Sequence, residues 1–409
     1  MNPVWASISM IGRVLAEALT SPFSIILFTA LVAVIAWQYR RASRFSGDLR
    51  GGGWRLSLQA ALLSAGFGMV GGLAGSLLLF GAGVDLSRIA ITPLWVAALL
   101  LMLISPRLLC FSYAGGLLGL SKLLFGFPDV SIPDLMALIA ILHLVESLLI
   151  LLDGRFYPVP LYVKRGNRLC GGFNLQKFWP LLLVVMMQDL NVMGSGQPDW
   201  MAVLGGGALG TGLYTVLAVL GYGEVSTAFS PGQKSLRSAG RLFCFSAVLL
   251  LLTFLSLKWP VFLWLSVLFS PLGHELVIWL GLREENRKTP LYVEPGAGVM
   301  VLDTRPASAA YRSGLKSGDV ILRGNGRPIL HSADLEAFLF LVSERVQLEG
   351  LHSGQPGAWT IEPSPEPMRG LIPVPGRHHS AYLTIPTDSL FSFASRMFRM
   401  LKGRFHRGL

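Results

Sequence analysis

Two pairs of ionisable side chains lie within apolar segments of the chain. His143 and Glu146 are three residues apart in Leu142–Ile150, so on a helix they share one face. His274 and Glu275 are adjacent in another apolar segment. Imidazole and carboxylate groups in such surroundings could relay protons or bind a metal ion, because ionisable groups inside a membrane are costly and seldom incidental. We favour a structural interpretation, a buried hydrogen-bonded cluster of these four residues, because no dense acidic pathway accompanies them.

The His274-Glu275 pair resembles the start of the zinc-protease motif H-E-x-x-H. In that motif two histidines one helical turn apart bind zinc, and the glutamate activates water. Here the fifth position is Ile278, which cannot bind a metal ion. Leu152-Asp153-Gly154 is a second similarity to site-2-type intramembrane metalloproteases, but it precedes the His-Glu pair instead of following it. We therefore predict no catalytic residue, no metal and no cofactor, with a degenerate protease-like protein or a transporter as the alternatives.

The cysteines add no recognisable site. Cys110, Cys170 and Cys244 are far apart and odd in number, which fits neither a disulfide framework nor a zinc-binding spacing. Cys110 and Cys244 lie in apolar segments, where cysteine behaves as a small hydrophobic residue. We expect that role for both.

The composition indicates a membrane protein. Hydrophobic residues make up 52% of the chain and charged residues 14%, whereas soluble domains have about 25% charged residues. The net charge is +11, and its excess lies in short loops and near the C-terminus. This distribution is typical of charges that orient spans and contact anionic lipid, so we predict no nucleic-acid partner.

The apolar segments predict a polytopic α-helical membrane domain over residues 21–283, with about eight or nine transmembrane helices. The third and fourth segments are separated only by Pro106-Arg107, so they form either a tight helical hairpin or one re-entrant element. The candidate segments are Pro22–Tyr39, Leu58–Phe80, Ile91–Ser105, Leu108–Phe127, Pro133–Asp153, Phe178–Met193, Trp200–Tyr222, Leu242–Leu257 and Val261–Leu282.

Loop charge orients these segments. Every second connection is basic, which by the positive-inside rule places the N-terminus outside and the region after the last span in the cytoplasm of a bacterium. With eight spans the N-terminus would move inside, while the C-terminal region would stay cytoplasmic. Glycine is dense in two spans, where it predicts close packing between helices. Those glycines are Gly66, Gly68, Gly71, Gly72 and Gly75 in the second span, and Gly205, Gly206, Gly207, Gly210 and Gly212 in the seventh.

The stretch Ser313–Ile329 resembles the middle of a PDZ domain, and we place a small mixed β/α domain of this kind at residues 290–375. Asn325-Gly326 predicts a tight turn between two strands, since both residues tolerate positive φ. We expect Val299–Leu302 to be an exposed edge strand that receives a peptide and Ala333–Leu341 to be the helix opposite. The loop before that strand resembles a carboxylate-binding loop, so the predicted peptide-binding residues are Gly296, Ala297, Gly298, Val299 and Met300.

Both ends of the chain have amphipathic character. Residues 1–20 predict a helix that lies in the membrane interface ahead of the first span. Residues 376–409 form a basic amphipathic tail suited to anionic lipid, with a disordered basic tail as the alternative.

A polytopic membrane region followed by one cytoplasmic PDZ domain resembles MinJ, the division-site topology family of Gram-positive bacteria. The resemblance covers the whole architecture, but its sequence signal is limited to the PDZ segment and, more weakly, to the segments around Glu146 and His274-Glu275. It implies a non-enzymatic membrane scaffold in division-site placement, with a DivIVA-like scaffold and a MinD-like ATPase as protein partners. A fold alone does not name a ligand, so these partners are expectations.

Overall fold

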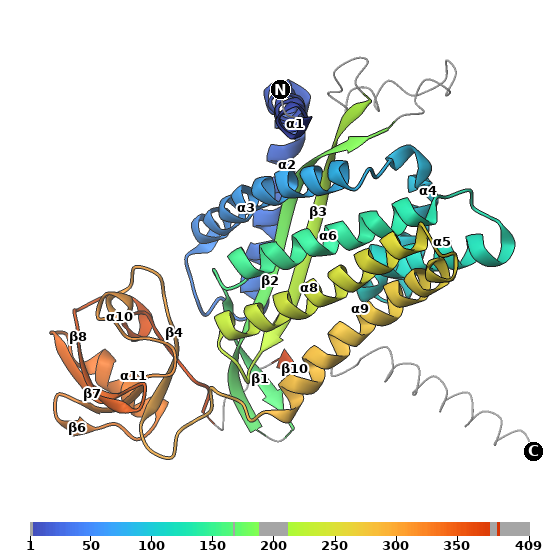
Figure 1. Ribbon diagram of the computed structural model, residues 1–409. Helices are drawn as coiled ribbons and strands as arrows, with labels where there is room; N and C mark the ends of the chain where they lie inside the picture. Colours follow the sequence, from blue (N-terminus) through green and yellow to red (C-terminus); the bar gives the residue numbers. More distant parts are fainter. Residues whose placement is uncertain (1–2, 167, 188–211, 377–382, 385–409) are drawn as a thin grey trace, which may run out of the picture.

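The computed structural model describes residues 3–166, 168–187, 212–376 and 383–384. The chain forms a bundle of apolar helices around a long β-hairpin, followed by a small C-terminal domain (Figure 1). The predicted basic tail, residues 376–409, lies outside the described residues except for Gly376, Leu383 and Thr384.

Five helices of the described chain are long and apolar enough to cross a membrane. The predicted eight or nine helical spans are therefore not supported. Serine followed by proline within the first two helical positions begins three of the five, because proline needs no N–H partner there. The side chains of Ser131 and Ser230 also cap free N–H groups of α6 and α8. The five are α2 (Pro22–Phe45), α3 (Gly53–Gly81), α6 (Ile132–Asp153), α8 (Pro231–Ser256) and α9 (Val261–Arg287).

Two shorter apolar helices form a hairpin beside α6. They are α4 (Ile91–Ile104) and α5 (Phe111–Phe125), joined by the 3₁₀ turn η2 (Pro106–Leu109). The base of the hairpin lies at the start of α6, where the Ser131 N–H donates to the Arg88 carbonyl at 2.8 Å. Each helix has at most 15 residues, about 22 Å at 1.5 Å per residue, which is short for a 30 Å hydrocarbon core. The structure thus has a helical hairpin at Pro106-Arg107, whose two helices are each shorter than a full span.

The predicted helical spans Phe178–Met193 and Trp200–Tyr222 are wrong in their described parts. These parts belong to strands β2 (Arg168–Met186) and β3 (Leu213–Ser226), which pair antiparallel along their length. β1 (Val159–Arg165) pairs with β2, and β10 (Leu383–Thr384) pairs with β1. A continuous apolar run does not distinguish a strand from a helix, since it lacks the alternation that marks a half-buried strand.

The glycines of α3 pack mainly against the β-hairpin formed by β2 and β3. A Cβ on Gly68 would lie 2.2 Å from the Pro180 carbonyl oxygen, and one on Gly72 would lie 2.5 Å from that of Leu182. The β2 backbone therefore runs directly along the helix surface. The prediction of close packing at these glycines is confirmed, but the predicted partner was another helix. The observed partner is in large part strand β2.

A helix precedes the first long span. This helix, α1 (Pro3–Thr20), buries Ile11 and Val14 against Val184 of β2 and Leu213 of β3. It covers the end of the β2–β3 hairpin that is far from the C-terminal domain (Figure 1). Its buried face thus packs on protein.

The C-terminal domain is a mixed β/α unit with strand order β8-β7-β5-β4-β9 and β6 beside β5. As predicted, Asn325 and Gly326 turn the chain with positive φ, and the helix predicted at Ala333–Leu341 is α11. Its elements are β4 (Val299–Thr304), α10 (Ala309–Arg312), β5 (Val320–Gly324), β6 (Arg327–Pro328), α11 (Ser332–Leu341), β7 (Val346–His352), β8 (Gln355–Ile361), η4 (Pro367–Gly370) and β9 (Leu371–Pro373).

The C-terminal domain packs against the end of the β2–β3 hairpin that contains Phe173. Leu302 and Ile372 share a buried apolar cluster with Phe173 of β2. The Tyr162 hydroxyl donates to the Pro373 carbonyl at 3.0 Å, and the Arg305 Nε donates to the Leu49 carbonyl at 3.0 Å. The C-terminal domain therefore packs directly against the helical bundle and its β-hairpin.

Candidate functional site

Three side chains with metal-binding atoms converge inside the helical bundle. The Cys110 Sγ lies 3.1 Å from the His143 Nε2 and 3.7 Å from the His274 Nε2. The three atoms all lie within 4.8 Å of one another. His143 is buried, and the other two side chains are partly buried. Each residue comes from a different element of the bundle.

The hairpin α4–η2–α5 brings Cys110 to the two histidines. Cys110 is the N-cap residue of α5, where its Sγ accepts a hydrogen bond from the Ser112 N–H at 3.4 Å. His143 lies 11 residues after Ile132, the first residue of α6, which places it about 16 Å along that helix. This is about half of a 30 Å hydrocarbon core. The tip of the α4–α5 hairpin therefore reaches the middle of the bundle, where Leu108 is buried and Leu109 is exposed.

Small residues let α5 lie close to both histidine-bearing helices. A Cβ on Gly115 would lie 2.3 Å from the Ile139 Cδ1 on α6, and one on Gly116 would lie 2.6 Å from the Pro271 Cδ on α9. Proline inside α9 removes one backbone N–H of that helix. The Ser270 hydroxyl donates to the Ser112 carbonyl at 3.0 Å, which joins α9 to the start of α5.

Hydrogen bonds orient both imidazole rings. The His143 Nδ1 lies 2.7 Å from the Ile139 carbonyl oxygen, which only accepts hydrogen bonds, so this nitrogen carries the proton. The His274 Nδ1 lies 3.3 Å from the Tyr113 hydroxyl, and that hydroxyl donates to the Glu275 carboxylate at 2.8 Å. Each ring therefore turns its Nε2 toward Cys110.

The predicted buried cluster is present in part. His143 and His274 are in edge-to-face contact, with ring centroids 5.2 Å apart. Glu275 joins them through Tyr113, whereas Glu146 is half-buried and makes no hydrogen bond to these residues within the described chain. Cys110 and Tyr113 were not predicted as members of the cluster, because their distance along the chain from both histidines gives no spacing signal.

A buried ion pair lies at the other end of α6. The Lys177 Nζ is 3.0 Å from the Asp153 Oδ1, with side chains 2% and 0% exposed. The Trp179 Nε1 and the Ser64 hydroxyl both donate to the other carboxylate oxygen. Burial lowers the pKa of Lys177, and the Asp153 carboxylate opposes that shift. Asp153 therefore joins α3, α6 and β2.

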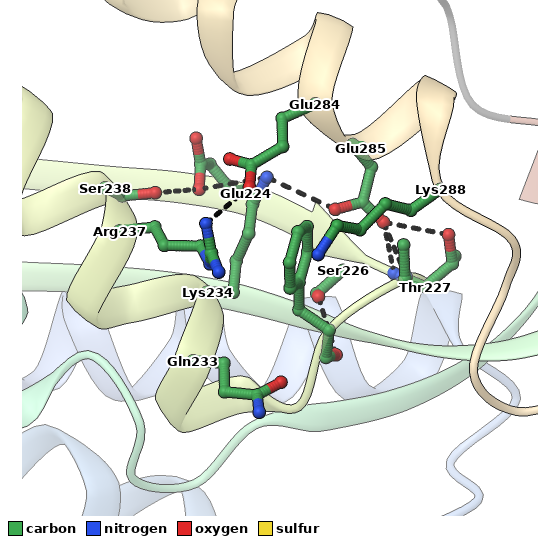
Figure 2. Close-up of polar contacts among 12 residues, drawn as sticks. Glu224, Ser226, Thr227, Gln233, Lys234, Arg237, Ser238, Glu284, Glu285 and Lys288 are labelled. Carbon is green, nitrogen blue, oxygen red and sulfur yellow. Dashed lines mark hydrogen bonds and ion pairs between the residues drawn. The ribbon is translucent and has the colours of Figure 1, made fainter.

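A second polar cluster joins β3, α8 and α9 near the C-terminal domain (Figure 2). The Glu285 carboxylate accepts hydrogen bonds from the Thr227 N–H at 2.7 Å and its hydroxyl at 2.9 Å. Lys234, which is 3% exposed, lies between Glu285 and Glu224 at 3.4 and 3.6 Å. Arg237 pairs with Glu284. All these acidic groups have partners, so the cluster holds the end of α9, where the C-terminal domain begins.

The prediction that Val299–Leu302 forms an edge strand of the C-terminal domain is wrong. β4 lies between β5 and β9 and has ladder partners on both sides. Val299 is buried in the domain core, and the Met300 carbonyl accepts a hydrogen bond from the Val374 N–H. A Cβ on Gly298 would lie 2.4 Å from the Ile321 carbonyl oxygen, so this glycine permits strand pairing. The sequence showed the first strand of the domain but not that the last one returns beside it.

The edge strand on that side is β9. Gly370 and Val374 form hydrogen bonds to the β4 side, and the Leu371 N–H donates to the Met368 carbonyl within the preceding loop. The loop before β9 has three consecutive residues with positive φ, namely Met368 (52°), Arg369 (49°) and Gly370 (85°). Non-glycine residues seldom adopt this conformation, which often marks functional loops.

The helix α11 lies alongside β9. The Arg369 guanidinium bonds to the Val342 carbonyl at the C-terminal end of α11 and to the Ile361 carbonyl. Beyond β9, a Cβ on Gly376 would lie 3.6 Å from the Ser332 Oγ at the other end of α11. An edge strand, a neighbouring helix and a strained loop therefore occur together in the described domain.

Comparisons with known proteins give a short match. No family model matches the chain. A stretch of 72 residues, 18% of the chain, is 38% identical to a protein from Marinomonas sp. (strain MWYL1) described as a probable periplasmic serine endoprotease DegP-like, of which it covers 13%. The similarity is therefore partial, and the resemblance to the MinJ family is not confirmed.

Proposed function

We propose that this protein is a non-enzymatic membrane scaffold whose C-terminal domain is PDZ-like and recruits a protein partner by binding a peptide at β9. The observation that carries the proposal is the combination of the edge strand β9, its neighbour α11 and the strained loop Met368–Gly370. A peptide end would dock beside β9 and against α11. The proposal moves the peptide site from Gly296–Met300 to this edge.

The backbone of β9 offers few groups to a peptide. Pro373 has no N–H, and its carbonyl is already bonded to the Tyr162 hydroxyl. The Leu371 N–H donates to the Met368 carbonyl, and the Arg369 N–H donates to the Glu366 carbonyl at 2.8 Å. Side-chain contacts would therefore carry the recognition. Phe340 and Leu341 near the end of α11 are 86% and 76% exposed, which suits an apolar side chain of a short peptide end.

Charge supports a cytoplasmic position for this domain. Basic residues gather at the helix ends on the side where the C-terminal domain lies (Figure 1). By the positive-inside rule, that side faces the cytoplasm. These residues are Arg40, Arg41 and Arg44 at the end of α2, Lys234, Arg237 and Arg241 in α8, and Arg283 and Arg287 in α9.

Site-specific photo-crosslinking tests the proposal. Phe340 is 86% exposed near the C-terminal end of α11, and Thr360 is exposed on β8, the opposite edge strand. A photoreactive residue at position 340 should trap a partner in native membranes, and one at position 360 should not. The DivIVA-like and MinD-like proteins implied by the MinJ resemblance are the first candidates to probe. Equal crosslinking at both positions, or none at 340, would contradict the proposal.

A further inference from the structure

We propose that Cys110, His143 and His274 form a binding site for a transition-metal ion, with Zn²⁺ the best fit. The sulfur-to-nitrogen distances are 3.1 and 3.7 Å. In a tetrahedral zinc site with Zn–S near 2.3 Å and Zn–N near 2.05 Å, these atoms are about 3.6 Å apart. The side chains therefore already stand close to a binding arrangement. This proposal replaces the metal-free cluster expected from the sequence.

The proton inventory of the cluster supports a cation. Both Nδ1 atoms carry their protons outward, to the Ile139 carbonyl and the Tyr113 hydroxyl, so both Nε2 atoms present lone pairs to Cys110. A thiol has one proton and satisfies one of these nitrogens. A metal ion bound by the thiolate and both nitrogens satisfies all three atoms at once.

The surroundings resemble the outer shell of known metal sites. Metal-binding histidines usually donate their other N–H to a carbonyl or, directly or indirectly, to a carboxylate, which fixes the ring and strengthens the ligand. His143 has the carbonyl of Ile139 and His274 has Tyr113 followed by Glu275. Phe245 stands edge-to-face against both rings, with centroid distances of 5.4 and 5.7 Å. These contacts hold the two ligands in place before a metal arrives.

The donor set selects the ion. One thiolate and two imidazoles suit zinc and similar soft or borderline metals, whereas Mg²⁺ and Ca²⁺ prefer oxygen ligands. Three protein ligands leave a fourth coordination position for water or another small ligand. The bound ion would fasten the tip of the α4–α5 hairpin to α6 and α9, the helices that carry His143 and His274.

Metal binding by the full-length protein in detergent tests the site. After chelation and gel filtration, the protein should rebind one Zn²⁺ per chain, and Co²⁺ should give a thiolate-to-cobalt charge-transfer band in the near ultraviolet. Cys110→Ser should abolish that band. The matched control is Cys244→Ser, which alters an exposed thiol on α8 and should leave the band unchanged.

A second measurement uses only the wild-type protein, so it tests the site even if the Cys110→Ser variant fails to fold. Zn²⁺ should raise the unfolding temperature of the metal-free wild-type protein, because a ligand that binds the native state stabilises it, while Mg²⁺ should not. Wild-type protein that rebinds no more zinc than Cys110→Ser, or whose unfolding temperature responds equally to both ions, would overturn the proposal. Peptide recruitment at β9 does not depend on this site.

Discussion

The buried pair Lys177–Asp153 gives the sharpest stability prediction. Asp153→Ala would leave the Lys177 ammonium in a site where it is 2% exposed and would remove the acceptor of the Trp179 Nε1 and the Ser64 hydroxyl. Breaking one partner of a buried ion pair costs about 3–5 kcal/mol. The lower figure corresponds to a roughly hundred-fold change in the unfolding equilibrium.

The matched variant removes both charges. Asp153→Leu combined with Lys177→Met leaves no unpaired charge, so it should unfold much closer to the wild type than Asp153→Ala does. The assay is unfolding of the full-length protein by SDS titration in mixed micelles, followed by tryptophan fluorescence. A cost below about 1 kcal/mol for Asp153→Ala, the range of an exposed pair, would refute the reasoning. A double variant as unstable as the sum of its single variants would also refute it.

The remaining predictions concern α3 and β4. Gly66→Ala should be neutral or stabilising, since nothing lies within 4 Å of the added Cβ, whereas Gly68→Ala should lower the unfolding midpoint because its Cβ would lie 2.2 Å from the Pro180 carbonyl oxygen. Similar midpoints for the two variants would contradict the packing of β2 along α3. Burial raises the pKa of the Asp303 carboxyl group, although Arg50 and the Thr304 N–H oppose the shift. The native protein therefore binds a proton at Asp303 more readily than the unfolded chain does. Its stability rises as the pH falls through the raised pKa toward the ordinary pKa of an aspartate. Asp303→Asn should therefore stabilise the protein at pH 7, and the gain should shrink near pH 4; equal effects in unfolding scans at both pH values would contradict the assignment.

The sequence located the apolar elements of the membrane region but not all their types. Loop charge and hydropathy mark each element, yet Phe178–Met193 and Trp200–Tyr222 predict helices because both are apolar without the two-residue period of a strand. β2 is buried along most of its length, whereas many residues of β3 are partly exposed. The described parts of both segments lie in β2 and β3. The glycines of α3 predicted close packing correctly, since it depends only on the missing Cβ, but not the nature of the partner.

The candidate sites show a similar division. His143, His274 and Glu275 were recognised because ionisable groups are conspicuous in apolar segments. Cys110 was not, because nothing local separates a cysteine that binds metal from one that packs, and its neighbours come from other helices. In the C-terminal domain the turn at Asn325-Gly326 was readable from local residues, whereas the return of β9 beside β4 depends on long-range pairing.

The most direct test of recruitment beside β9 compares the same substitution at two exposed positions. Phe340 is 86% exposed near the end of α11, so Phe340→Asp places a charge where the peptide would pack. Thr360→Asp places the same charge on the opposite edge strand, β8. Partner capture should be measured by crosslinking pull-down from native membranes at equal abundance of both variants. We predict that Thr360→Asp retains the partner and Phe340→Asp loses it. Equal capture by both variants would contradict the account, because recruitment would not then depend on the face formed by α11 and β9.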